Sequence, residues 1–109
     1  MENTICNFTK SKLLTEKFTL KLIDTLKQIK ENDTNYHVRY SLIIKAMYYS
    51  ELIGYETGLR CDDNWPVVIV HLPEGQVSWH MEPDSIRFDG HSTQEKYARI
   101  DRYINNNKE

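Results

Sequence analysis

The sequence lacks most of the patterns that identify a reaction. Its 109 residues include only four glycines and three prolines, and the glycines form neither a GxGxxG fingerprint nor a phosphate-binding loop. No GxSxG pattern is present, so a nucleophile elbow is excluded. The two cysteines, Cys6 and Cys61, stand outside any CxxC pair, which disfavours a thiolate zinc site and predicts reduced thiols.

Long apolar runs and an excess of positive charge are also missing. The longest apolar run, residues 67–70, is far too short to cross a bilayer. The first ten residues lack the apolar segment of a signal peptide, which favours a cytoplasmic protein without membrane contact. The formal net charge of -2 disfavours a duplex nucleic acid as partner, because duplex binders carry a basic surface.

The residues that are present suffice for one small domain. Hydrophobic residues make up 39% of the chain, and its aromatic side chains are two Trp, three Phe and seven Tyr. We expect residues 1–109 to form a single α+β domain, with residues 1–10 and 105–109 flexible.

Two amphipathic helices are predicted in the first half of the chain. The first has Ser11 or Thr15 as its N-cap and a buried stripe at helical spacing, made of Leu14, Phe18, Leu22, Leu26 and Ile29. The second begins near Tyr36 and ends before Gly54, which stands where a helix C′ glycine is expected. Its predicted inner face consists of Leu42, Ile43, Ala46, Tyr49 and Ile53.

A three-stranded antiparallel meander is predicted to follow, over residues 55–61, 65–72 and 76–81. The middle strand is the most clearly marked, because β-branched residues dominate it. Pro73 presets the turn before the third strand, and Gly75 can adopt a positive φ there. Because alternate residues of a strand point to opposite faces, we expect Trp79 to face the helices and His80 to be exposed or locally hydrogen-bonded.

A C-terminal helix is predicted from Thr93 to Tyr103 or Ile104. Ser92 is its expected N-cap, and Glu95 stands at the spacing that completes a capping box. The side chains expected to face the core are Tyr97, Ile100 and Ile104.

The polar residues of the second half allow a metal or acid–base site without specifying one. His71 and His80 fall on adjacent predicted strands and His91 stands beside Asp89, but no pair has HxH or HExxH spacing. His80 or His91 could form an acid–base pair with Glu56 or Asp89, a description that fits any small protein with four histidines. The simpler interpretation is that His91 belongs to a turn and that His80 forms local hydrogen bonds.

The segments SWH at residues 78–80 and DGHSTQEKY at residues 89–97 resemble blocks of a family of small proteins encoded by phages and prophages. The resemblance covers roughly the C-terminal half of the chain and implies a genomic setting, since it brings no catalytic residues with it. Members often carry a tryptophan before the Asp-Gly-His block, where this chain has Phe88. A role that requires an indole at that point is therefore not implied.

We expect a binding protein without turnover, similar to phage accessory factors that counteract host defence in the cytosol of the host cell. Its ligand would be a small nucleotide-like molecule or a host protein. No cofactor, metal site or catalytic residue is expected. The residues predicted to contact the ligand are Tyr55, Arg60, Trp79, His80, Asp89, His91 and Tyr97.

Two other functions remain open from the sequence. One is a small metal-dependent or acid–base hydrolase that uses His80, Asp89 and His91. The other is a protein interaction module, in which an exposed edge of the meander contacts another protein or a second copy of the chain.

Overall fold

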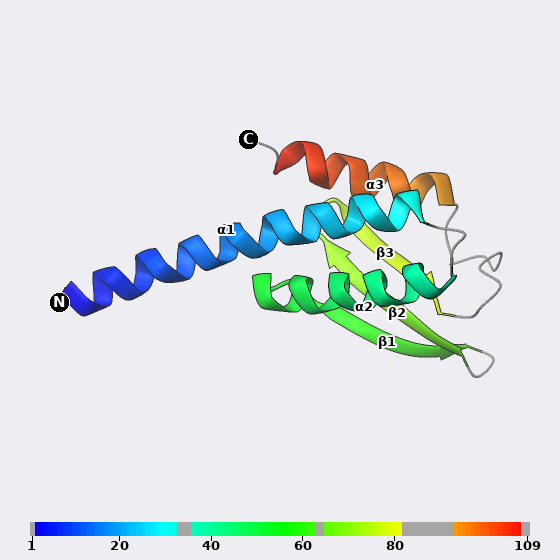
Figure 1. Cartoon of the computed structure of the whole chain (residues 1–109), viewed down its shortest axis with the longest axis horizontal. Coiled ribbons are helices and arrows are strands. Elements are labelled where there is room, and N and C mark those ends of the chain that lie inside the picture. The colour runs from blue at the N-terminus through cyan, green and yellow to red at the C-terminus, as the bar shows by residue number, and fades with distance from the viewer. Residues whose placement is uncertain (1, 33–35, 63–64, 82–92, 108–109) are drawn as a thin grey trace.

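The computed structural model describes residues 2–32, 36–62, 65–81 and 93–107, with side chains from Leu13 onward except at positions 36, 62, 65 and 93. The three strands form one antiparallel sheet in the order β1-β2-β3 (Figure 1). The elements in chain order are α1 (Glu2–Glu31), α2 (Tyr36–Ile53), β1 (Thr57–Asp62), β2 (Trp65–Leu72), β3 (Gly75–His80) and α3 (Thr93–Asn106). The predicted α+β fold of two helices, a meander and a C-terminal helix is confirmed.

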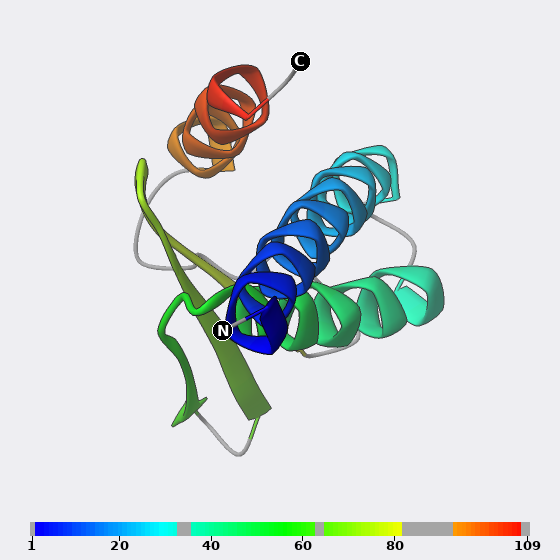
Figure 2. The ribbon, with the colours of Figure 1, turned by 90° about the vertical axis from the view of Figure 1, so that its left-hand side faces the viewer.

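The helices surround the sheet in two different ways. α1 and α2 lie next to each other against one face of the sheet, whereas α3 lies beside the edge strand β3 (Figure 2). None of the described helices is long and apolar enough to span a membrane. The core between these elements includes the buried side chains Leu22, Leu26, Ile29, Ile43, Val68, Val70, Val77, Trp79, Ile100 and Tyr103.

The register of the sheet explains which strand residues enter this core. Val68 pairs with Trp79 and Val70 pairs with Val77, and all four side chains are buried. Because these positions alternate along each strand, they share the face that packs on the helices. The prediction that Trp79 faces the core is confirmed.

Two glycines adopt positive φ where the sequence predicts it. Gly54 has a φ of 110° directly after α2, and the amide of the next residue, Tyr55, donates to Ser50 O (2.9 Å). Such a left-handed residue ends a helix at little cost when it is glycine. Gly75 has a φ of 139° at the start of β3, where it closes the turn that follows Leu72.

The predicted start of α1 is wrong. The helix begins at Glu2 and runs through both Ser11 and Thr15, so neither residue is its N-cap. A threonine is accommodated inside this helix because its hydroxyl can bond one turn back, as Thr19 Oγ1 does by donating to Thr15 O (2.9 Å). Leu14, expected in the buried stripe, is 43% exposed because the N-terminal part of α1 extends beyond the rest of the molecule (Figure 1).

Of the two alternatives expected for His80, exposed or locally hydrogen-bonded, exposure is wrong. His80 is 3% exposed and Ser78, two residues earlier on the same face of β3, is 1% exposed. From Val77 to His80 every residue of the strand is buried. A strand buried on both faces loses the simple relation between alternation and exposure on which the prediction depends.

Candidate functional site

The outer edge of β3 is contacted by three basic side chains. In an antiparallel ladder the backbone groups of successive residues point alternately toward and away from the neighbouring strand. The carbonyls of Gln76, Ser78 and His80 therefore point away from β2. The donors that reach them are Arg99 Nη1 to Gln76 O (2.5 Å), Lys96 Nζ to Ser78 O (3.1 Å) and Arg39 Nη1 to His80 O (2.7 Å). We call Arg39, His80, Lys96 and Arg99 the β3-edge cluster.

Arg39 enters this cluster from α2. It lies on the inner side of the helix, three and four residues before the buried Leu42 and Ile43, and is only 3% exposed. Removing a guanidinium from water is unfavourable unless hydrogen bonds replace its hydration. Its bond to His80 O supplies part of that replacement and joins α2 to the end of β3.

Lys96 enters from the first turn of α3 and is 2% exposed. Its Nζ lies 5.7 Å from the ring centre of Trp79 and 5.8 Å from that of Tyr97, besides bonding to Ser78 O. A desolvated ammonium over aromatic faces is stabilised by the negative potential of those faces. Trp79 therefore supports the position of Lys96 from inside the core, and the half-buried Tyr97 lies beside it.

Arg60 lies on the same face of the sheet as His80. Arg60 pairs with Val67 and Val67 pairs with His80, so the three residues form one row across the strands. Arg60 is exposed and Val67 is fully buried. Of the predicted ligand-binding residues, the structure places Trp79 and Tyr97 beside Lys96. The side chain of His80 lies on the face of β3 opposite to that of Trp79, and Arg60 lies two strands away from His80.

Tyr55 does not belong to this group. Its ring packs edge-on against Tyr103 with centres 5.9 Å apart, and the two hydroxyls are hydrogen-bonded at 3.2 Å. Tyr103 is seven residues beyond Lys96, or about 10 Å further along α3. Burial, followed by the hydrogen bond with Tyr55, raises the pKa of the Tyr103 phenol well above its usual range. Tyr55 thus has a packing role at the opposite end of α3.

Two of the predicted residues, Asp89 and His91, lie outside the described residues. Their segment connects the end of β3 to the start of α3, the two elements that carry His80 and Lys96. Among the side chains that the structure does describe, no group of three or more His, Cys, Asp and Glu lies close enough to hold a metal ion. The hydrolase built on His80, Asp89 and His91 stays a prediction.

Three members of the cluster were not predicted from the sequence. Arg39 and Lys96 both occupy positions of a buried stripe, since Lys96 stands four residues before Ile100 and seven before Tyr103. A basic residue at such a position is a signal that helical periodicity could have given. Arg99 has no comparable signal, because its contact with Gln76 O depends on how α3 docks on β3.

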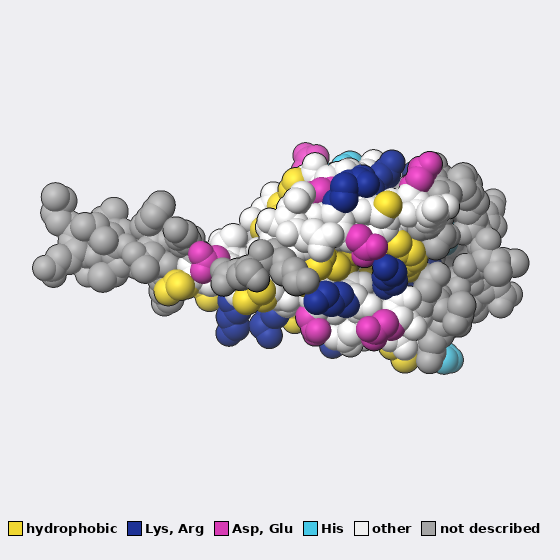
Figure 3. Space-filling view, turned by 90° about the horizontal axis from the view of Figure 1, so that it is seen from above, with side chains coloured by type: hydrophobic (Ala, Val, Ile, Leu, Met, Phe, Trp, Pro, Cys, Tyr) yellow, Lys and Arg dark blue, Asp and Glu magenta, His cyan; other side chains and the backbone are white. Residues whose placement is uncertain are grey.

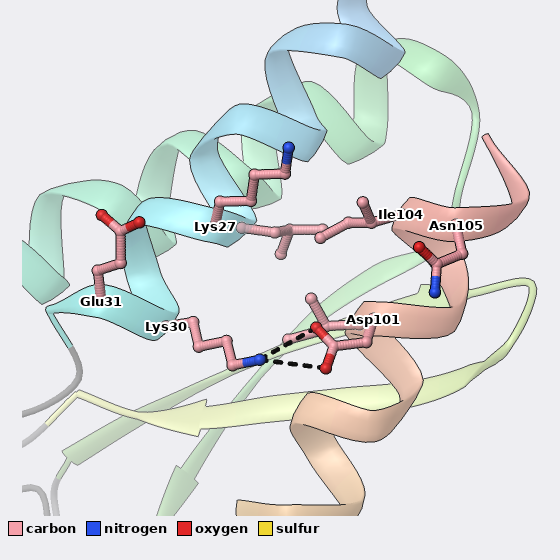
Figure 4. Close-up of a pocket in the computed structure, with 8 residues that line it drawn as sticks. Lys27, Lys30, Glu31, Asp101, Ile104 and Asn105 are labelled. Atoms are coloured by element: carbon pink, nitrogen blue, oxygen red, sulfur yellow. Dashed lines mark hydrogen bonds and ion pairs between the residues drawn. The ribbon is translucent and has the colours of Figure 1, made fainter. Parts of the chain in front are cut away.

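The described residues also form two hollows between α1 and α3. The larger has a volume of about 670 Å³, with Leu26, Ile100 and Ile104 among its apolar lining, and an ion pair of 3.1 Å between Lys30 and Asp101 joins its two sides (Figure 4). The smaller hollow has a volume of about 530 Å³ and shares Lys27 and Ile104 with the larger one. Charges of both signs surround apolar side chains on this face of the molecule (Figure 3). The larger hollow is lined by two lysines and two acidic residues, so its formal charges cancel and do not favour an anion.

The comparison with protein families matches residues 23–103 to the WDGH domain. No curated protein and no solved structure matches the chain. The match includes α2, the whole sheet and most of α3, and it spans the Asp89-Gly90-His91 block, whose letters are the last three of the family name. Since the match covers well over half of the chain, the protein belongs to the WDGH domain family.

Proposed function

We propose that this protein binds a small anionic, nucleotide-like molecule at the β3-edge cluster, without converting it. The observation that carries the proposal is the burial of Arg39, His80 and Lys96 together at one end of β3. These residues come from three different elements, and burial of polar and charged groups is unfavourable for folding. Departures of this kind from favourable packing are expected at functional sites.

The charges of the cluster favour an anion. Carbonyl oxygens two residues apart on a strand are about 6.6 Å from each other, so Arg39 and Lys96 deliver two positive charges to neighbouring points of the same edge. Guanidinium and ammonium groups are the side chains that most often bind phosphate. Arg99 adds a third positive charge at Gln76 O of the same edge, and Arg60, exposed on the same face of the sheet as His80, adds a fourth two strands away.

Aromatic groups beside the cluster favour a planar ligand. Tyr97 is half-buried next to Lys96, which leaves part of its ring accessible for stacking. Trp79 Nε1 is buried and has no hydrogen-bond acceptor among the described residues. A buried donor without an acceptor costs about 1–3 kcal/mol, and an acceptor atom of a ligand would remove that cost. Asp89 and His91 complete the predicted set of ligand contacts.

The biological part of the proposal comes from the resemblance to phage-encoded proteins. We propose that the ligand is a nucleotide signal of host defence and that the protein lowers its free concentration by sequestering it in the host cytosol. A host protein as the target is the alternative within the same role. Expression of the chain in a host whose defence depends on such a signal is expected to restore phage growth, and plaque counts measure it.

Turnover is the feature that separates this proposal from the hydrolase alternative. The tag-free protein is screened by thermal unfolding against nucleoside mono-, di- and triphosphates and cyclic dinucleotides, and the nucleotide that raises the unfolding temperature most is incubated with the protein. After denaturation of the protein, chromatography is expected to recover that nucleotide unchanged. Stoichiometric zinc or manganese together with a converted nucleotide would instead establish the hydrolase. If no nucleotide raises the unfolding temperature, the proposal is wrong.

A further inference from the structure

The two edges of the sheet differ in how their backbone groups are used. The strand order β1-β2-β3 makes β1 and β3 the edge strands. Side chains of the β3-edge cluster donate to the successive outward carbonyls of β3 and so close that edge. Within the part of the chain that the structure describes, no side chain donates to the outward carbonyls of β1, which lies at the free side of the sheet (Figure 2).

The outward backbone groups of β1 belong to Thr57, Leu59 and Cys61. The carbonyl of Glu56 accepts from the amide of His71 (2.9 Å), so Glu56 turns toward β2. Because backbone groups alternate in direction along a strand, the next residue and every second one after it turn outward. Leu59, at the middle of this edge, has a side chain that is 65% exposed. The β1 edge therefore presents donors and acceptors at the spacing of another extended strand.

β1 lacks the features that usually protect an edge strand. Its pairing with β2 is consecutive from Thr57 to Asp62, so no bulge twists the edge away. The strand contains neither proline nor lysine. Natural proteins commonly use such features to prevent pairing between edges. The β1 edge is therefore open to the addition of a strand.

The charges along this edge favour a second copy of the chain as the added strand. Glu56, directly before β1, and Arg60 are both exposed and lie on the same face of the sheet as Gly58. When two β1 strands pair antiparallel about Gly58, Glu56 of each copy lies opposite Arg60 of the other. Opposite charges directly across two strands stabilise their pairing. In the same register Thr57 exchanges backbone hydrogen bonds with Leu59 of the other copy.

The neighbouring registers lack this charge complementarity. A register centred on Leu59 leaves Glu56 without a cation opposite it, and one centred on Arg60 sets two guanidinium groups opposite each other, which is unfavourable. Arg60 also has an interaction within its own chain, and the several N–H donors of a guanidinium allow it to keep that interaction in the pair.

We propose that β1 pairs with β1 of a second copy in the register centred on Gly58. This pairing joins the sheets of two copies into one continuous sheet across a twofold axis. The inference goes beyond the proposed ligand site, because β1 and β3 are opposite edges of the sheet. The dimer can therefore fail while ligand binding holds, and the reverse.

Sedimentation equilibrium of the tag-free chain at about 1 to 100 μM tests the dimer. The expected mass is 26.0 kDa, twice the 13.0 kDa of one chain. Glu56→Arg and Arg60→Glu each set like charges opposite one another, so each variant alone is expected to sediment at 13.0 kDa. An equal mixture of the two variants again sets opposite charges across the strands and is expected to regain the mass of the dimer. Lys45→Glu, the same change of charge at an exposed residue of α2, is the matched control and is expected to keep that mass.

The mixture makes the test specific, because a regained dimer shows that both variants are folded. A parent protein of 13.0 kDa at the highest concentration would overturn the proposal and leave the β1 edge to a strand of another protein. A parent dimer that persists in both single variants would also overturn it, because another surface would then hold the copies together. A mixture that stays at 13.0 kDa, or loss of the dimer in the Lys45→Glu control, would do the same.

Discussion

At the scale of single residues, we expect Tyr103 to contribute to the response of the fold to alkaline pH. Its phenol is fully buried and bonded to Tyr55, and this burial raises the pKa above the value of about 10 that the unfolded chain has. A group whose pKa is raised by folding stabilises the fold fully below the unfolded pKa, and that contribution is lost as the pH rises further. Tyr103 therefore makes the protein less stable above about pH 10.

The corresponding variant is Tyr103→Phe, which keeps the ring and removes the ionisable hydroxyl. Urea denaturation at about pH 8 and pH 11 is expected to show a large fall in the unfolding free energy of the parent and a smaller fall in the variant. Tyr48→Phe, at an exposed tyrosine, is the control and should behave as the parent does. Equal falls in the parent and in Tyr103→Phe would show that Tyr103 does not carry the effect.

At the scale of elements, the contact between the β2–β3 turn and α3 depends on Gly75. A Cβ at this position would lie 2.9 Å from Arg99 Cδ, and the positive φ is unfavourable for any other residue. We expect Gly75→Ala to lower the unfolding free energy by about 1–3 kcal/mol. When Arg99 is already replaced by Ala, the loss of unfolding free energy caused by Gly75→Ala should shrink to the part that comes from the positive φ. A double-mutant cycle in urea therefore measures the energy of the contact between the new Cβ and Arg99. If Gly75→Ala lowered the unfolding free energy equally with and without the Arg99 side chain, a steric clash between the Cβ and Arg99 would be excluded.

The elements that the sequence predicts well are those with strong local signals. β2 has the predicted bounds because β-branched residues dominate Trp65–Leu72, and Gly54 ends α2 as its position indicates. β1 and β3 are shifted by one or two residues and α3 ends at Asn106, because strand and helix ends depend on packing as well as on local preference. The start of α3 at Thr93 is confirmed, whereas its expected N-cap, Ser92, lies outside the described residues.

The candidate site could be predicted only in part, because its members meet through tertiary packing. The alternation of β3 identifies Trp79 as a core residue and gives no sign that His80 is buried as well. Arg39 and Lys96 are found by asking which basic residues fall in an apolar helical stripe. That they approach carbonyls two residues apart follows from the docking of α2 and α3 at the same edge of the sheet.

At the scale of the whole molecule, the proposed ligand site lies apart from the extended part of α1. The β3-edge cluster lies where α2, β3 and α3 meet. The longest dimension, 53 Å, is along α1, whose N-terminal part extends beyond the other elements (Figure 1). The extended shape therefore comes from α1, whereas the proposed ligand site depends on the packing of α2 and α3 on β3.

Titration calorimetry with Lys96→Met tests the central claim, a nucleotide site at the β3-edge cluster, most directly. Methionine fills nearly the volume of the buried lysine without its charge, so the fold should persist. Lys27→Met, at an exposed lysine of α1 beside both hollows, is the matched control. The account predicts that the nucleotide chosen by the thermal screen binds Lys96→Met at least about tenfold more weakly than the parent, a loss of about 1.4 kcal/mol, and binds Lys27→Met equally well. Undiminished binding to Lys96→Met together with weakened binding to Lys27→Met would contradict the account and place the site between α1 and α3.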